Sequence, residues 1–340
     1  MGFLPSARNL LKAWLLCLGT AAAVGALFWW ASGYRAASLA VFCVLLAAAG
    51  LYWTLDRVAP GMVGARELAA AEAPLLRSTV ERLAARVGVA RPRLYFLDDG
   101  HPRAFAAGRG PRGSSLTVSA GLLMAASPAE LDGILAHELV HIANRDVLVQ
   151  TTVSVISGFL IEVTRLAGWF QRAFLFVFAP IGASLTHLLL SPNREYSADR
   201  AAAVVCESPH GLADGLLRLE AAGSMVEFAA SPATEPLYTV NPFEEAGLAA
   251  MFVTHPPLGE RVRRLRELDP SGATVYARRS SSGNSENITE SRRDPSRYSR
   301  FDRSTASRRN PAFSATPCEA TLSGSVMSSR RFSPTSSTAH

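Results

Sequence analysis

Two long apolar segments near the start of the chain limit its possible folds more than any other feature. Residues 13–31 and residues 36–55 contain no charged side chain. A helix of either length can cross a hydrocarbon layer about 30 Å thick. Tryptophan and tyrosine side chains lie near the ends of these segments, as they do at membrane interfaces. The sequence therefore predicts a transmembrane helical hairpin within residues 1–60, and a cleavable signal peptide would explain only the first segment.

The basic residues around this hairpin predict its orientation. Arg8 and Lys12 precede the two segments, and Arg57 and Arg66 follow them. Only Arg35 lies in the turn between them. Because basic residues favour the cytoplasmic side of a membrane, we expect both ends of the hairpin and the following domain in the cytoplasm.

The composition of the chain excludes several other classes of protein. Of the 340 residues, 49% are hydrophobic, which is high for a soluble protein. The net charge of +6 does not indicate a nucleic-acid partner, because much of the positive excess lies in residues 271–340. The four cysteines are far apart and form no Cys-x-x-Cys pair, so neither a disulfide framework nor a thiolate metal site is expected. This use of cysteine fits a reducing compartment.

Serine, arginine and threonine dominate residues 271–340, and apolar periodicity disappears there. This composition predicts a disordered basic tail. Two interpretations of this tail remain open. It binds acidic lipid headgroups or a partner, or it is a solvated extension that the protein does not need.

The segment between the hairpin and the middle of the chain predicts a small sheet among helices. Residues 66–88 have the pattern of an amphipathic helix, and residues 93–97 that of a short strand. Two more strands are expected over residues 103–106 and 115–118, separated by the turn-rich residues 108–113. This order predicts a small sheet packed against helices, with an edge strand that can hold an extended peptide.

Residues 137–141 read His-Glu-Leu-Val-His and follow a predicted helix start at Ser127 and Pro128. Two histidines four residues apart lie on the same face of a helix, where both imidazoles can bind one metal ion. The glutamate beside the first histidine can take a proton from a water molecule at that metal. The alternative is a pair of ordinary histidines near a glutamate, because this short pattern also occurs by chance.

A catalytic zinc site needs a third protein ligand. The best candidate is Glu195, and Asp199 lies four residues later on the same helix face. Asp199 can accept a hydrogen bond from a ligand imidazole and fix its tautomer. The alternative is a solvated acidic face, which is the common role of such residues.

A second pair of apolar segments follows the histidine motif, within residues 147–190. Each is near the length that spans a membrane, and we expect a membrane-inserted hairpin there. A buried helical hairpin inside the soluble domain is the alternative, because ionisable residues within a bilayer are costly.

Three motifs in this order resemble the HtpX family of membrane-bound zinc metalloproteases, which are relatives of the CAAX prenyl proteases. They are the sequences of residues 137–146, 193–199 and 254–261. The resemblance covers roughly residues 10–268. It implies a mainly helical α+β fold, with a gluzincin-type zinc peptidase domain over residues 61–270 and transmembrane helices. It also implies a place in the cytoplasmic membrane of a bacterium, with the active site facing the cytoplasm. It also implies a role in protein quality control and the stress response, with misfolded or damaged membrane proteins as substrates.

The resemblance also implies the roles of the site residues. One Zn²⁺ ion per chain would be held by His137, His141 and Glu195, with Glu138 as the general base. The residues expected to stabilise the oxyanion are His255 and Arg261. Asp199 would support a ligand imidazole, and Asn144 and Asp146 would support the helix that carries the two histidines. For His255 the alternative role is that of a turn residue before two prolines.

Two residues depart from the family pattern. Pro192 precedes the segment of the third ligand, where a basic or small polar residue is common. Arg103 stands where relatives usually have asparagine, on the strand expected to bind substrate. A maturation protease with one specific partner would use the same site residues, and a catalytically inactive membrane scaffold is a third possibility. The sequence does not determine the oligomeric state.

Overall fold

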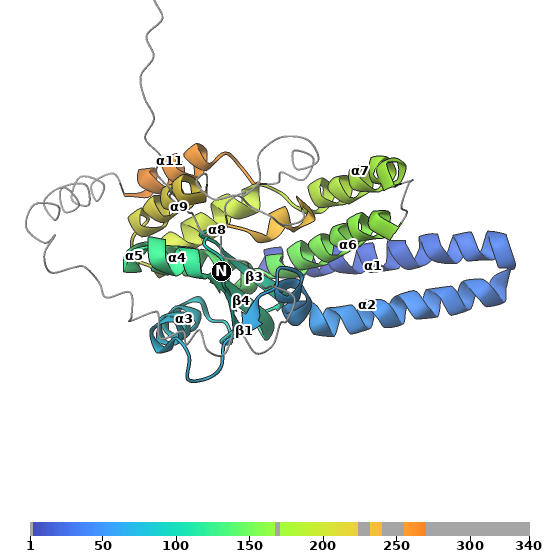
Figure 1. Ribbon diagram of the computed structural model, residues 1–340, viewed down its shortest axis with the longest axis horizontal. Coiled ribbons are helices and arrows are strands. Elements are labelled where there is room, and N and C mark those ends of the chain that lie inside the picture. The colour runs from blue at the N-terminus through green and yellow to red at the C-terminus, as the bar shows by residue number, and fades with distance from the viewer. Residues whose placement is uncertain (1–2, 167–170, 224–231, 240–254, 270–340) are drawn as a thin grey trace, which may run out of the picture. The chain divides into compact units, whose positions relative to one another are not determined.

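The computed structural model describes residues 3–166, 171–223, 232–239 and 255–269, all within one compact unit that spans residues 1–295. It begins with two antiparallel helices, α1 (Phe3–Ser32) and α2 (Tyr34–Met62), which form the expected hairpin (Figure 1). Gly33 joins them with a φ of 79°, a conformation that glycine adopts readily. Apolar side chains such as Trp30 (85% exposed) cover the outside of the hairpin. Both helices are long and apolar enough to cross a membrane.

A four-stranded sheet follows, in the order β1-β2-β4-β3. Its strands are β1 (Arg66–Glu67), β2 (Arg93–Leu97), β3 (Ala104–Gly110) and β4 (Gly113–Ser119). β2 and β4 are parallel, whereas β3 and β4 form an antiparallel hairpin. The three strands predicted from the sequence are therefore present, and β3 lies at an edge of the sheet.

The helix predicted over residues 66–88 is wrong in its first part. Helix α3 (Pro74–Val87) begins at a proline, which favours the first turn of a helix. Arg66 and Glu67 instead pair with β2, and Leu68 N donates a hydrogen bond to Leu94 O. Pairing with a neighbouring strand therefore overrides the helical pattern of this segment.

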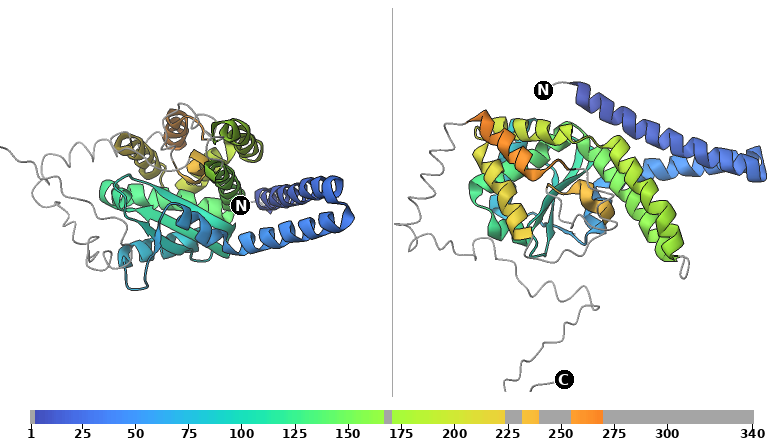
Figure 2. Two further views of the ribbon diagram at one scale, coloured as in Figure 1. Left: turned by 45° about the vertical axis from the view of Figure 1, so that its right-hand side comes forward. Right: turned by 90° about the horizontal axis from the view of Figure 1, so that it is seen from above.

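The predicted motif helix is present as α5 (Pro128–Ala143), after the short helix α4 (Ala120–Ala125). Ser127 and Glu130 form a reciprocal capping box at its start. α5 packs against β3, and also against α8 (Asn193–Val205) and α9 (His210–Gly223) (Figure 2). Helix α11 (Leu258–Leu268) packs against α8 and α9.

The second apolar pair forms helices α6 (Asp146–Leu166) and α7 (Gln171–Leu189), which pack against each other. α6 also contacts α1, α2 and the short helix η2 (Pro232–Leu237). Phe176 and Leu188 of α7 are 83% and 78% exposed. Within the described residues, the apolar part of α6 (Asp146–Phe159) is shorter than a span. Insertion of residues 147–190 in a membrane therefore stays a prediction, and the predicted tail over residues 271–340 lies outside the described residues.

Candidate metal centre

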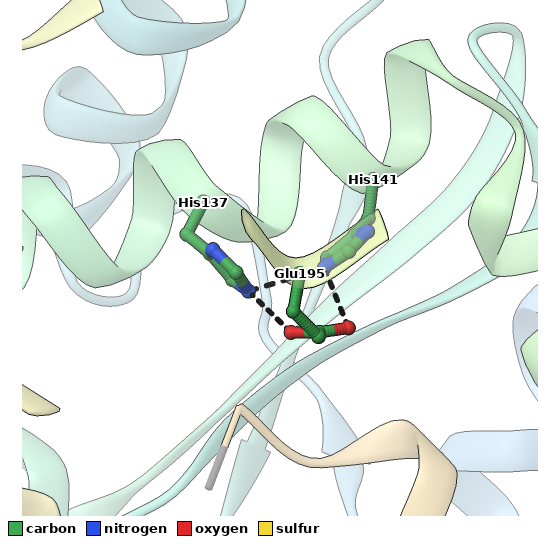
Figure 3. A group of neighbouring side chains, drawn as sticks. All are labelled: His137, His141 and Glu195. Carbon is green, nitrogen blue, oxygen red and sulfur yellow. Dashed lines mark hydrogen bonds and ion pairs between the residues drawn. The ribbon is translucent and has the colours of Figure 1, made fainter. Parts of the chain in front are cut away.

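Three buried side chains from two helices converge on one point (Figure 3). His137 and His141 lie one turn apart on α5, and Glu195 reaches them from the first turn of α8. The Nε2 atoms of the two histidines are 3.1 Å apart. The carboxylate oxygens of Glu195 lie 3.4 Å from His137 Nε2 and 3.5 Å from His141 Nε2. The structure thus brings together the three residues predicted as metal ligands.

The chemistry of this cluster fits a bound metal ion. The exposed fraction of each of the three residues is 2% or less. Within the described part of the chain, neither carboxylate oxygen of Glu195 takes part in a hydrogen bond of ordinary geometry. A buried carboxylate that accepts no hydrogen bond is costly, and a divalent cation would satisfy its oxygens. Two imidazoles and one carboxylate are also the ligand set of one well-known type of catalytic zinc site.

Asp199 contacts the His137 ring on the side away from Glu195, and Arg261 in turn binds Asp199. The Nδ1 atom of His137 lies 2.9 Å from Asp199 Oδ1. The Arg261 guanidinium donates to both Asp199 oxygens, at 2.8 Å and 2.7 Å, and to Thr239 O at 2.7 Å. Arg261 is 1% exposed, so its charge depends on these partners. The contact with Asp199 fixes the tautomer and the orientation of the His137 ring.

His141 has a corresponding support, which includes a side chain of the apolar N-terminal hairpin. Its Nδ1 atom lies 3.0 Å from Asp146 Oδ2. Asn9 of α1 donates through Nδ2 to Asp146 Oδ1 at 2.6 Å and to Asn144 O at 3.1 Å. A side chain of the first apolar helix therefore orients the acid that orients a candidate metal ligand. The contact of Asn144 in this network is made by its backbone carbonyl.

Buried acids around the cluster favour positive charge on the two imidazoles. Burial alone lowers the pKa of His141, but the charge of Glu195 and the hydrogen bond with Asp146 raise it to about 10. The pKa of His137 is also raised, because its contacts with Asp199 and Glu195 outweigh burial. Burial alone raises the pKa of Asp199, but Arg261 lowers it to about 2. The cluster therefore attracts a cation, either protons or a metal ion.

Glu138 points to the edge strand of the sheet. Its Oε2 atom accepts a hydrogen bond from Ala106 N of β3 at 2.8 Å. Its Oε1 atom accepts one from Thr239 Oγ1 at 2.7 Å, and the same hydroxyl lies 3.1 Å from Ala104 O. Glu138 is 3% exposed. These contacts hold the carboxylate of Glu138 against β3, next to His137 in the chain.

The remaining residues predicted for the site also lie near Glu195. His255 Nε2 is 4.0 Å from Glu195 Oε1. Arg261 Nη1 lies 3.7 Å from Glu195 Oε2, although its hydrogen bonds go to Asp199 and Thr239. This geometry gives Arg261 the contacts of a positioning residue. Arg103 lies with its guanidinium 5.7 Å from the centre of the Tyr238 ring, beside the start of β3.

Three residues around the candidate ligands were not predicted from the sequence. Asn9 gave one signal, since a polar amide in an apolar helix is costly without a partner. Thr239 gave none, because its partner Glu138 is distant in sequence. Arg194 stands next to a predicted ligand, and its Nε atom lies 3.3 Å from Glu195 Oε1. Its side chain is 9% exposed, which no local pattern indicated.

Two histidines one helical turn apart, a glutamate from a second helix and a further buried glutamate beside the first histidine are the arrangement typical of metallopeptidases. The sequence pattern of peptidase family M48 matches residues 70–269. A protein described as "Protease HtpX homolog" from Pelotomaculum thermopropionicum is 35% identical over 282 residues, which cover 76% of this chain and 99% of the relative. Another from Acidiphilium cryptum is 36% identical over 280 residues, which cover 76% and 96%.

Among solved structures, Ste24p from S. mikatae is similar with a TM-score of 0.42 and 16% identity, covering 78% of this chain and 66% of that one. The chain belongs to peptidase family M48 and, within it, to the HtpX proteases. It is thus a metalloprotease with a mainly helical α+β fold and two apolar N-terminal helices that can span a membrane.

Proposed function

We propose that this protein is a zinc-dependent endopeptidase that cuts cytosolic segments of misfolded or damaged membrane proteins. The observation that carries the proposal is the buried cluster of His137, His141 and Glu195 with Glu138 beside it. The substrate class comes from the family resemblance. Exposed apolar side chains along α1 and α2 support a location in the membrane, close to such substrates.

His137, His141 and Glu195 would hold one Zn²⁺ ion. When bound there, the ion supplies Lewis acidity and makes water a nucleophile at neutral pH. Glu138 then accepts the proton of the attacking water and delivers it to the nitrogen of the leaving amine. His255 stabilises negative charge on the carbonyl oxygen, since it lies beside Glu195. Arg261 acts on this step by holding Asp199 against His137.

The edge strand β3 supports binding of an extended substrate. β3 pairs with β4 on one side only, and its other side faces Glu138 through Ala106 N. A peptide added to this edge would receive backbone hydrogen bonds, as in other cases of strand addition. Side chains already bond to this edge, since Thr239 donates to Ala104 O, Ala106 N donates to Glu138 and Gly108 N donates to Thr151. A bound peptide has to displace such a contact wherever it pairs with β3.

The location proposed is the bacterial cytoplasmic membrane, with several spans and the site on the cytoplasmic side. The distribution of basic residues supports this orientation, because Arg35 alone lies in the turn of the hairpin. A cytoplasmic site would meet loops and tails of membrane proteins after they lose their native packing.

Cleavage by detergent-purified protein tests the proposal. Full-length protein loaded with Zn²⁺ should cut casein, and Glu138→Gln should abolish cleavage while the metal stays bound. The matched control is Glu220→Gln on the exposed surface of α9, which should cleave like the original protein. Folded protein that binds no Zn²⁺ would overturn the proposal and favour the membrane scaffold.

The same residues would serve a maturation protease that acts on one partner. Identification of cleavage sites across a membrane proteome separates the two functions. Many unrelated sites in destabilised membrane proteins are expected for quality control. A single defined site in one protein would favour maturation instead.

A further inference from the structure

A cavity lined by arginines lies at the foot of α2, away from the metal centre. Its volume is about 110 Å³. Four arginines line it, and a buried aspartate of α2 and a serine of β4 contribute as well: Asp56, Arg91, Arg93, Arg109, Arg112 and Ser114. The walls come from α2, the loop before β2, and the hairpin between β3 and β4. The cavity is therefore built by segments that are far apart in the sequence.

Arg109 is held in a fixed position within this cavity. Its guanidinium carbon lies 4.2 Å from the centre of the Trp53 ring, and 5.8 Å from that of Tyr52. On the other side it passes over Gly113, where an added Cβ atom would lie 2.3 Å from Arg109 Nε. A larger residue at position 113 would require the Arg109 side chain to shift from this place. The guanidinium is thus stacked on an aromatic ring before any ligand arrives.

Positive charge in the cavity exceeds the negative charge that faces it. Arg93 Nε lies 3.5 Å from Asp56 Oδ2, and Arg91 forms an ion pair with Glu81. Within the described residues, no carboxylate lies within ion-pair distance of Arg109 or Arg112. Two guanidinium groups therefore remain to bind an anion. Planar guanidinium groups match the oxygen geometry of phosphate.

The cavity lies at the depth of lipid headgroups if α2 spans the membrane. Trp53 is 65% exposed, and with Tyr52 it closes the charge-free segment of α2. Such aromatic side chains lie at the boundary between hydrocarbon and headgroups. Asp56 follows Trp53 by one helical turn, so the cavity begins where the hydrocarbon ends.

We propose that this cavity binds the phosphate of an anionic phospholipid. Arg109 and Arg112 would contact the phosphate oxygens, and the acyl chains would lie along the exposed apolar face of α2. The proposal rests on α2 as a membrane span and is independent of proteolysis. A site of this kind would fix the depth of the hairpin between β3 and β4, and β3 is the strand that reaches Glu138.

Lipid retention by full-length protein tests the proposal. Protein is reconstituted in nanodiscs of phosphatidylcholine and phosphatidylglycerol, released into detergent, and weighed with its bound lipids by native mass spectrometry. The original chain should retain one phosphatidylglycerol in preference to phosphatidylcholine. The Arg109→Gln/Arg112→Gln double variant should weaken this retention by about tenfold or more, given the usual contribution of each basic residue at a membrane surface.

Arg57→Gln is the matched control, because Arg57 is an exposed basic residue of α2 that does not line the cavity. It should retain the lipid like the original chain. An equal loss of lipid retention in Arg57→Gln and in the double variant would show that general surface charge attracts the lipid, and would overturn the proposal. Displacement of the lipid by inorganic phosphate, at a concentration similar to that of the lipid, would also overturn the proposal, because it would show a site for free phosphate. Casein cleavage in detergent, measured on the same samples, reports separately on the proposed protease function.

Discussion

Asp146→Asn tests whether the support behind His141 determines metal affinity. The substitution keeps the shape of the side chain but removes its charge. Asp146 accepts one hydrogen bond from Asn9 Nδ2 at 2.6 Å and contacts His141 Nδ1 at 3.0 Å. Both partners present a donor, whereas asparagine offers one acceptor oxygen and one donor NH₂ group. At least one of the two contacts must therefore be lost.

The magnitude follows from the contact that is lost. A hydrogen bond to a charged group contributes about 1.5–3 kcal/mol. Loss of an acid behind a metal-binding histidine lowers metal affinity about 10–100-fold, which corresponds to about 1.4–2.8 kcal/mol. The two values agree, so Asp146→Asn should weaken Zn²⁺ binding by one to two orders of magnitude. Excess Zn²⁺ should restore most of the cleavage.

Competition between the purified protein and a zinc chelator of known affinity measures this effect. Asp132→Asn is the matched control, since Asp132 lies on the same helix α5 and pairs with Arg82 at the surface. It should bind Zn²⁺ with unchanged affinity. The reasoning fails if Asp146→Asn binds Zn²⁺ as tightly as the original chain while remaining folded.

Three further outcomes are expected. Gly133→Ala should lower the melting temperature, because the new Cβ atom would lie 2.6 Å from Leu212 N, and such overpacking costs about 1–3 kcal/mol. The control Gly259→Ala should leave the melting temperature unchanged, because none of the described residues lies close to the new Cβ atom. Burial raises the pKa of Glu130, but hydrogen bonds from Arg218 outweigh this and lower it. Ionised Glu130 therefore stabilises the folded state above the ordinary glutamate pKa, and this stabilisation is lost as the pH falls through the lower pKa of the folded state. In denaturant titrations, the free energy of unfolding should fall less on acidification in Glu130→Gln than in the original chain. A chain that ends at residue 270 should bind Zn²⁺ and cleave casein unchanged, and loss of either would give the tail a function.

The local parts of the fold followed from the sequence because short-range physics determines them. Two charge-free segments of spanning length predicted α1 and α2. Ser127, Pro128 and Glu130 predicted the start of α5 through capping that involves only neighbouring residues. The helix predicted from residue 66 failed because strand pairing with β2, a contact from outside the segment, prevailed there.

The candidate ligands were also predictable, since their spacing on a helix is a local property. His137 and His141 share a face of α5 whatever surrounds them. Glu195 was found by its place in a motif, although nothing in its own segment shows where α8 packs. The structure brings it within 3.5 Å of the two imidazoles.

The sequence by itself determined the apolar hairpin, the helix that carries His137 and His141, and the class of chemistry, because each depends mainly on residues within a few turns of one another. Only the tertiary structure decided what surrounds that chemistry. Asn9 reaches Asp146, Thr239 reaches Glu138, and Arg109 stacks on Trp53 across separations that no periodicity encodes. These contacts arise when whole helices and strands pack, so their partners are determined by the shape of the assembled domain and not by any single segment.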